Sequence, residues 1–177
     1  CVLIAEELNI TASKVSFDKK KSKVILDGEI KASDVSNNSL YANKAEYNKK
    51  LNLLNSFGTT KIVTSQNYIL ESENVEFDNN NKIIKSDFNT KIIDPDGNII
   101  KVNMFNYNSI KNILYSRGEI ILKDKNKNEF LFSEIYIDEK KKKIIGSDVK
   151  IFFNDKAFKA NPNNDPRIFA NSVSLSE

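Results

Sequence analysis

Apolar and polar residues alternate in short runs along most of the chain, and these runs return at a fixed interval. A large apolar residue followed by Asp or Asn occurs every thirty residues, in five successive copies. A fixed period between about 20 and 50 residues is typical of architectures that stack one unit along an axis. With this residue as position zero, its copies are Phe17, Tyr47, Phe77, Tyr107 and Ile137, and Leu175 follows after a longer interval.

Other positions keep the same period and define strands and turns within each unit. The Asp or Asn after position zero predicts a turn, because its side chain bonds the backbone two residues further on. β-branched runs such as residues 92–93 and 120–122 favour strands. Residues 40–54 also fit a helical pattern, but they occupy the columns that are rich in Val, Ile and Phe elsewhere, so we expect strand there. The pattern predicts an all-β fold, a jelly roll or taco of strand–turn–strand repeats with about eleven strands.

Strands of roughly 8–10 residues joined by turns indicate two sheets folded face to face. Such a fold encloses an apolar seam, which is only a core if the sheets meet fully and a groove if one side stays open. We expect an open groove for acyl chains, since each buried CH₂ contributes about 0.8 kcal/mol. Core packing is the alternative for each residue taken singly. The candidate groove residues occupy position zero and the position two before it: Val15, Phe17, Ala45, Tyr47, Val75, Phe77, Phe105, Tyr107, Ile135 and Ile137.

Composition and charge limit the kinds of binding site and catalytic site that the chain can form. The net charge is +3 and the basic residues are nearly all Lys, with only Arg117 and Arg167, which disfavours the Arg-based reading of nucleic acids. The chain has no His, the commonest general base and metal ligand. Cys1 is the single cysteine, so no disulfide forms within this stretch.

Acidic residues offer two weak candidates for site chemistry. Residues 94–97 resemble the start of a calcium loop, but an EF-hand needs Glu at position twelve, where Phe105 stands, so a turn is expected. Neighbouring carboxylates could serve a glycosidase, but on a strand they form a solvated face more often. We therefore expect no enzyme, cofactor or metal. The carboxylate pairs are Glu71 with Glu73 and Asp138 with Glu139.

Lysines gather at one turn position of the repeat, in residues 19–21, 49–50 and 140–143. They should line one rim of the stack. Two interpretations stay open: these lysines attract lipid phosphates or an anionic membrane surface, or they keep the turns soluble.

The two ends of the sequence carry further expectations. Residues 1–7 resemble a signal-peptide remnant cleaved after Ala5, with an ordinary first strand as the alternative. Residues 8–177 form one domain, and residues 161–166 read as an inserted loop. The last unit stops midway, which predicts either a fragment of a longer chain or a last strand completed by another chain.

The repeated motif resembles a known family. The stretch "ITASKVSFDKKKSKVILDGEIKA", echoed by "LYANKAEYNKKLNLLNSFGTTKI", combines an apolar strand, a small residue such as Ala12, an apolar-x-aromatic step, Asp or Asn, and Gly eleven residues after the aromatic. This combination is similar to the OstA-like domain of lipopolysaccharide-transport proteins, over essentially residues 8–177. Of its two types, the N-terminal domain of LptD looks closer than the LptA-like bridge protein.

The resemblance implies a periplasmic β-jelly-roll that binds lipopolysaccharide in its apolar interior. It implies edge-strand pairing with other OstA-like domains. For an LptD-like chain it also implies an outer-membrane barrel in the same chain, a plug lipoprotein as partner, and a disulfide partner role for Cys1. Two other functions stay open: a structural β-stack such as an adhesin with a closed core, and a carbohydrate-active enzyme.

Overall fold

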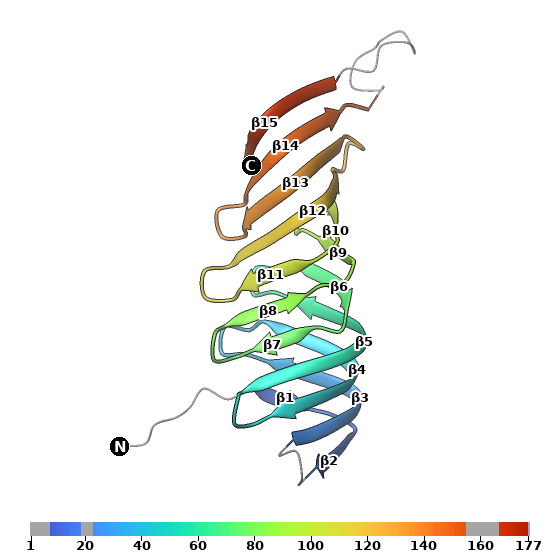
Figure 1. The fold of residues 1–177 in the computed structure, drawn as a ribbon, viewed down its shortest axis with the longest axis vertical. Helices are drawn as coiled ribbons and strands as arrows, with labels where there is room; N and C mark the ends of the chain where they lie inside the picture. Colours follow the sequence, from blue (N-terminus) through green and yellow to red (C-terminus); the bar gives the residue numbers. More distant parts are fainter. Residues whose placement is uncertain (1–7, 19–22, 155–166, 177) are drawn as a thin grey trace, which may run out of the picture.

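The computed structural model describes residues 8–18, 23–154 and 167–176, which form fifteen strands of one antiparallel sheet. Within these residues no helix has the length and hydropathy of a membrane span. The strands stack along one long axis, from the N-terminal end at the bottom of Figure 1 to the C-terminal end at the top. In chain order they are β1 (Asn9–Thr11), β2 (Lys14–Asp18), β3 (Lys23–Ser33), β4 (Ser39–Asn48), β5 (Leu53–Val63), β6 (Ile69–Glu73), β7 (Glu76–Asp78), β8 (Ile83–Ser86), β9 (Thr90–Ile93), β10 (Ile99–Val102), β11 (Phe105–Asn108), β12 (Ile113–Lys123), β13 (Glu129–Asp138), β14 (Lys143–Phe152) and β15 (Arg167–Ser176).

The sheet folds over along a line that crosses its long strands, and we call this fold line the spine. An arm is one passage of the chain from one edge of the folded sheet, across the spine, to the other edge. The pairing register shifts there, for example between Asp27 and Ile30 in β3 and between Arg117 and Ile120 in β12. The period-thirty glycines lie at this spine: Gly28, Gly58 and Gly118 all have positive φ, a conformation that lacks a steric cost only for glycine.

Four arms break into two strands at the spine, namely β1/β2, β6/β7, β8/β9 and β10/β11. Counting each of these pairs as one arm gives eleven arms among the described residues, the number predicted from the sequence. The all-β expectation is confirmed, and residues 40–54 lie in β4, a turn and β5. The two sheets expected face to face are two layers of one folded sheet, because the strands run through the fold.

Each layer presents one unbroken row of apolar side chains to the interior. In the first layer, position zero pairs with the residue seven places after it, strand after strand. This row is Phe17, Val24, Tyr47, Leu54, Phe77, Ile84, Tyr107, Leu114, Ile137, Ile144 and Leu175. The facing row of the second layer is Ile10, Ala32, Leu40, Ile62, Leu70, Ile92, Ile100, Leu122, Phe130, Ile151 and Ile168. We call the space between the two rows the lane.

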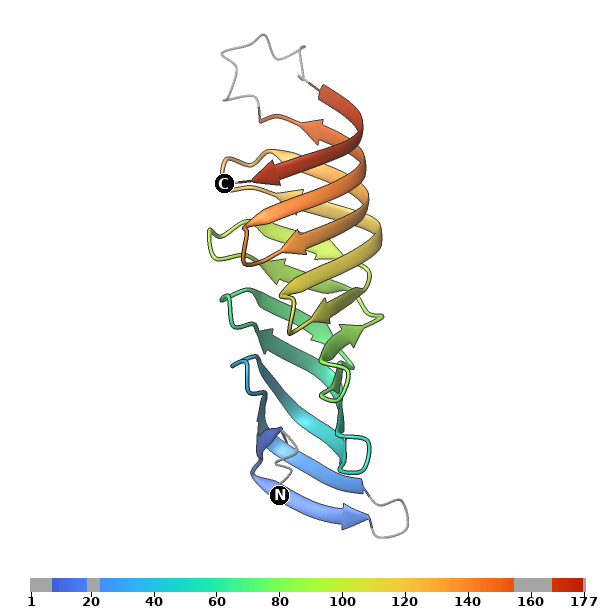
Figure 2. The same ribbon diagram turned by 90° about the vertical axis from the view of Figure 1, so that its left-hand side faces the viewer.

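The free edges of the two layers end in turns, which form two rims opposite the spine. The asparagine rim comprises the turns at residues 34–38, 64–68, 94–98 and 124–128. The lysine rim comprises those at residues 48–53, 78–83, 108–113 and 138–143. In Figure 2 the asparagine rim follows the left edge, and the lysine-rim turns nearest the N-terminal end stand opposite, at the lower right.

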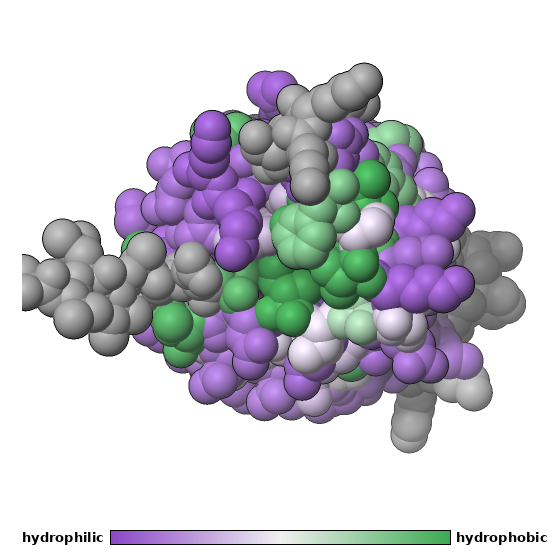
Figure 3. All heavy atoms as spheres, turned by 90° about the horizontal axis from the view of Figure 1, so that it is seen from below, coloured by the Kyte–Doolittle hydropathy of each residue, from purple (hydrophilic) through white to green (hydrophobic). Residues whose placement is uncertain are grey.

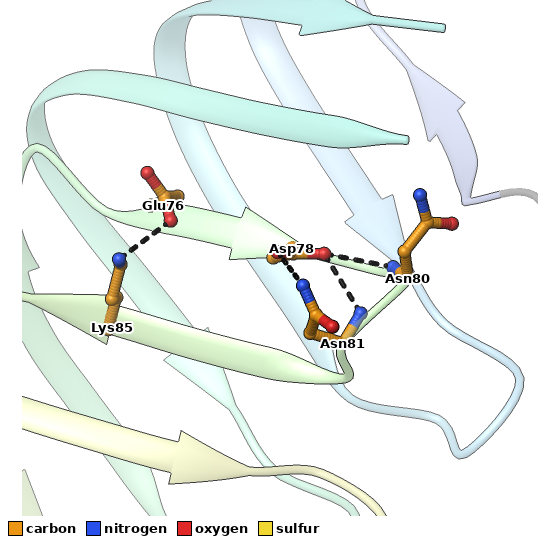
Figure 4. Close-up of polar contacts among 5 residues, drawn as sticks. All are labelled: Glu76, Asp78, Asn80, Asn81 and Lys85. Atoms are coloured by element: carbon orange, nitrogen blue, oxygen red, sulfur yellow. Dashed lines mark hydrogen bonds and ion pairs between the residues drawn. The ribbon is translucent and has the colours of Figure 1, made fainter. Parts of the chain in front are cut away.

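Local side-chain chemistry shapes the turns of the lysine rim. Asp78 accepts hydrogen bonds from the backbone N–H groups of Asn80 and Asn81 and from the Asn81 amide (Figure 4). These bonds hold the pKa of Asp78 below its ordinary value although burial acts in the opposite direction. An ion pair of 3.0 Å between Glu76 and Lys85 joins β7 and β8, the two strands that this turn connects.

Asparagines join successive turns of the other rim. The side-chain oxygen of Asn38 accepts from the backbone N–H of Ser65 in the next turn, and Asn98 does the same for Lys125. Asn128 accepts from the backbone N–H of Asn154, which follows β14. Tyr68 interrupts the series at the turn before Pro95. Pro95 has no backbone N–H, so an asparagine at position 68 would find no donor there.

Candidate functional site: the lane and its rims

Most of the ten candidate groove residues lie inside the packed core. Eight of them, from Ala45 to Ile137, are buried, and Phe77, Phe105 and Tyr107 are among the largest fully buried side chains. Val15 and Phe17 are exposed. The structure therefore brings all ten onto the inner face of one layer, but only the first two reach solvent. Their role as lipid-binding residues stays a prediction.

The N-terminal end of the lane is open. Val15 is 54% exposed and Phe17 is 70% exposed, although their strand partners Leu26 and Val24 are buried. Paired residues of neighbouring strands share a face, so Val15 and Phe17 point inward, and none of the described strands beyond β2 covers them. Seen from this end, an apolar patch lies within a polar ring (Figure 3).

The C-terminal end exposes the opposite layer. Ile168 of β15 is 47% exposed and belongs to the second-layer row, whereas Phe17 belongs to the first. Val173 and Leu175 are partly buried against the core. The two ends thus present inner surfaces of different layers.

The two rims close the side of the lane at its centre. The Ser65 hydroxyl on the asparagine rim lies 2.9 Å from the side-chain oxygen of Asn112 on the lysine rim. Further along, Asp96 and Lys142 form an ion pair of 3.6 Å across the rims. The sequence analysis expects one side of the groove to stay open, and the structure differs from this at the centre. The two layers meet there, so the lane is not open from the side along its whole length.

A buried polar cluster accompanies this closure. The Tyr107 hydroxyl lies 3.0 Å from Glu139 Oε2 and 3.3 Å from the side-chain oxygens of both Asn38 and Asn112. We call Asn38, Ser65, Tyr107, Asn112 and Glu139 the rim latch. It joins the first two described turns of the asparagine rim to the last two described turns of the lysine rim, which are far apart in sequence.

Glu139 is the unexpected member of the rim latch. Its side chain is only 2% exposed, and its Oε1 atom has no hydrogen-bond partner. Burial raises the pKa of the Glu139 carboxyl to about 7, against the opposing effect of the bonds from Tyr107 and Thr64. Burial, followed by the charge of Glu139, also raises the pKa of the Tyr107 phenol above its ordinary value.

The sequence missed the role of Glu139, because the pair Asp138 and Glu139 resembles a solvated turn. Its repeat position held a usable signal. The equivalent residues Asn79 and Ser109 are polar but buried, and each donates its backbone N–H to the preceding turn, as Glu139 does to Asn112.

A small cavity opens between the rims beyond the Asp96–Lys142 ion pair. Its volume is about 180 Å³, and apolar residues of both lane rows reach it beneath a polar margin. It is lined by Tyr68, Asp94, Asn98, Leu122, Asp124, Phe130, Lys142, Ile144 and Leu175.

The other candidate chemistry resolves into structural roles. Asp94 accepts bonds from the backbone N–H groups of Asp96 and Asn98, which confirms a turn. Glu71 and Glu73 are exposed, as expected for a solvated face, and Glu71 pairs with Lys91. No group of three or more His, Cys, Asp or Glu side chains within the described residues could hold a metal ion. Cys1, residues 1–7, the lysines at 19–21 and the inserted loop at 161–166 lie outside the described residues.

Comparison with known families identifies the chain. The model of the family described as OstA-like protein matches residues 4–161, most of the sequence. The chain belongs to the OstA-like family. The expected resemblance is confirmed at this level, whereas the narrower LptD-like assignment stays a prediction.

Comparison with individual proteins adds little to this OstA-like assignment. Among solved structures the chain is similar to LptH of Pseudomonas aeruginosa, described as the LptA-homologous periplasmic component of the lipopolysaccharide transport device. The identity is 10%, the TM-score is 0.32, and the match covers 93% of this chain and 94% of that one. A search of curated protein sequences finds no match.

The motif that carries the OstA-like resemblance now has a structural meaning. Its aromatic residue lies in the first-layer row, its Asp or Asn opens a lysine-rim turn, and its glycine turns the sheet at the spine. The motif therefore encodes a folded sheet with an apolar interior.

Proposed function

We propose that this OstA-like chain is a periplasmic conduit domain that carries lipopolysaccharide toward the outer membrane, and that it is not an enzyme. Acyl chains lie in the lane while sugars and phosphates stay in solvent. The observation that carries the proposal is the pair of apolar rows, which run unbroken from β1 and β2 to β15. The choice of lipopolysaccharide as the bound lipid rests on membership of the OstA-like family and on the sequence resemblance.

Lipid entry requires the two layers to part, since the centre of the lane is packed. The hydrogen bonds that join the rims contribute about 1 kcal/mol each. Burying ten CH₂ groups of one acyl chain contributes about 8 kcal/mol. Lipid burial therefore outweighs the rim contacts, and the spine provides a natural hinge line because its register shifts already interrupt the ladder.

The partners follow from the strand edges. Among the described strands, β1 and β2 pair only with β3, and β15 pairs only with β14, so each end offers an unpaired edge. Arg167 is the only charged residue of the ten in β15, which leaves that edge without the lysines or prolines that usually block pairing. Other OstA-like domains dock there and continue the lane. If the chain is LptD-like, an outer-membrane barrel and its plug lipoprotein are further partners.

Lysines beside the rims suit the polar part of this cargo. Lys49 and Lys50 are exposed on the lysine rim, next to the N-terminal half of the lane. Phosphate groups of a lipid whose chains occupy the lane lie within reach of such side chains. Their alternative role, keeping the turns soluble, requires no lipid.

Photocrosslinking tests the proposal with a matched control. p-Azidophenylalanine replaces Phe17 at the open end, Phe77 at the centre, or Phe169 on the outer face. Phe169 is 65% exposed, close to the value for Phe17, but it lies beside Lys150 on the opposite face of the sheet. Lipopolysaccharide adducts at Phe17 and Phe77 but not at Phe169 are expected. Adducts at Phe169 alone, or at none of the three, contradict the proposal.

A closed structural stack is the second candidate. The burial of eight of the ten lane residues and the contact between the rims favour it. Such a scaffold binds no lipid inside, so it predicts no adduct at Phe77 under any condition. The same crosslinking experiment therefore separates the two functions.

A further inference from the structure

The Tyr107 hydroxyl faces three hydrogen-bond acceptors but carries one proton, and the orientation of the neighbouring amides shows this. The Asn38 amide nitrogen donates to Asp34 Oδ2 at 2.9 Å, so its oxygen must face Tyr107. The Asn112 amide nitrogen donates to the Ile110 carbonyl at 3.1 Å, which directs its oxygen to Tyr107 as well. The phenol oxygen thus faces two amide oxygens and one carboxylate oxygen.

Tyr107 has one proton to share among these three acceptors. The Ser65 backbone N–H supplies Asn38, and the Ser65 hydroxyl lies against Asn112. When Glu139 is ionised, its Oε2 accepts the Tyr107 proton, so no hydrogen lies between the phenol oxygen and either amide oxygen, and each amide oxygen keeps only its bond from Ser65. The Thr64 hydroxyl also bonds Glu139, but Oε1 has no hydrogen-bond partner. A proton on Glu139 lets the carboxyl donate to the phenol oxygen and releases the phenol proton to one amide oxygen.

No cation lies among the groups that bond Glu139. The groups that bond it are the Tyr107 phenol from β11, the Asn112 carbonyl of the same rim, which accepts the Glu139 backbone N–H, and Thr64 from the facing rim. Behind them, Asp34 is engaged with Asn38. On the segment of Glu139 itself, Asp138 pairs with Lys141, and Lys142 pairs with Asp96. Ionisation therefore leaves a buried charge that two hydroxyl groups bond but no cation compensates.

Because of where the rim latch lies, the protonation of Glu139 affects the contact between the two rims. The rim latch holds the two rims together over the centre of the lane, between the open N-terminal end and the cavity of about 180 Å³. We propose that the rim latch is a proton-controlled side gate: it closes the lane while Glu139 is protonated and parts when Glu139 ionises, admitting a lipid acyl chain. The gate deepens the proposed lipid function and rests on it.

The gating test compares crosslinking at two depths of the lane. p-Azidophenylalanine at Phe77 reports the centre and at Phe17 the open end, with lipopolysaccharide as the probe, at about pH 5 and about pH 8. Adducts at Phe77 rise several-fold with pH, whereas adducts at Phe17 stay constant. In E139Q, which keeps the shape but not the charge, the rise is lost. If the Phe77 variant fails to fold, Phe105 takes its place.

A matched control uses a second Glu–Tyr contact. Glu134 accepts a 2.8 Å bond from Tyr115 on the outer face of the sheet. E134Q therefore changes the same chemistry away from the rims, and its Phe77 adducts keep the pH dependence of the native chain. Equal pH dependence in E139Q and E134Q overturns the gate. Absence of adducts at both Phe17 and Phe77 overturns the proposed function instead.

The rim latch is also tested without lipid. Hydrogen exchange by NMR, corrected for intrinsic rates, measures the protection of the Ser65 amide, which bonds Asn38 within the latch. Protection in the native chain falls at least several-fold from about pH 5 to about pH 8, and it does not fall in E139Q. Unchanged protection in the native chain contradicts the gate whatever the lipid experiment shows.

Discussion

Replacing Phe77 and Phe17 by alanine measures how firmly the empty lane is packed. The two residues occupy the same position of the repeat and the same face of the sheet, but Phe77 is fully buried and Phe17 is 70% exposed. Replacing a fully buried phenylalanine by alanine lowers the free energy of unfolding by about 3–5 kcal/mol, because contacts are lost and a cavity remains. Phe17 buries about a third of its surface, so Phe17→Ala costs about 1 kcal/mol or less.

The assay is urea unfolding of the lipid-free chain, followed by far-UV circular dichroism, for F77A, F17A and the native chain. F169A is the control, because Phe169 has similar exposure to Phe17 on the outer face and should lose as little as F17A. A loss below about 1 kcal/mol for F77A would refute the packed centre and favour a lane that is open from the side.

Three further predictions concern single residues. A Cβ at Gly146 would lie 2.6 Å from Phe132 Cε1, so Gly146→Ala should lower the free energy of unfolding by about 1–3 kcal/mol. Adding Phe132→Leu should recover part of this loss, measured by thermal melting. No recovery would mean that the clash lies elsewhere. The pKa of Glu139 in the folded chain, about 7, exceeds its ordinary value of 4.5, so the stabilising effect of protonated Glu139 is complete below about pH 4.5 and is lost as pH rises through 7. The free energy of unfolding should therefore fall by about 3 kcal/mol over this range in the native chain but not in E139Q. The same pH profile in both chains would contradict this assignment to Glu139. Lys142→Ala removes a partly exposed ion pair of 3.6 Å and should lower the free energy of unfolding by less than about 1 kcal/mol in urea unfolding, so a larger loss would give Lys142 an unexpected share in holding the rims.

The repeat was predictable because each of its main positions has one clear physical requirement. Position zero faces the interior, Asp or Asn opens a turn, and glycine takes the positive φ of the spine at Gly28, Gly58 and Gly118. Departures are tolerated where another residue meets the requirement: Asp148 adopts a left-handed conformation with φ of 51° at the fifth copy of the glycine position.

The closure of the lane was not predictable in the same way. Whether the layers meet depends on contacts between turns far apart in the chain, such as Ser65 with Asn112 and Tyr107 with Asn38. Periodicity reports which face a residue occupies and not how far the opposite layer lies. The same pattern therefore describes the exposed Phe17 and the fully buried Phe77.

The asparagine rim carried a signal that periodicity could have shown. Asp followed four residues later by Asn occurs at residues 34, 94 and 124, at multiples of the same thirty-residue period. In the structure each of these Asp side chains bonds its Asn, and each Asn reaches the next turn. Short polar pairs are common in turns, so only their shared period distinguishes them from solvated loops.

Methyl NMR of the chain titrated with lipopolysaccharide tests the central claim most directly. Isoleucine δ1 methyl groups sample both faces of the sheet: Ile84, Ile92 and Ile100 are buried in the lane, whereas Ile25, Ile110 and Ile145 are exposed outside it. The lane predicts nuclear Overhauser effects between acyl-chain protons and the first three methyl groups only. Contacts confined to the exposed methyl groups, or none at all with saturating lipid, would contradict it.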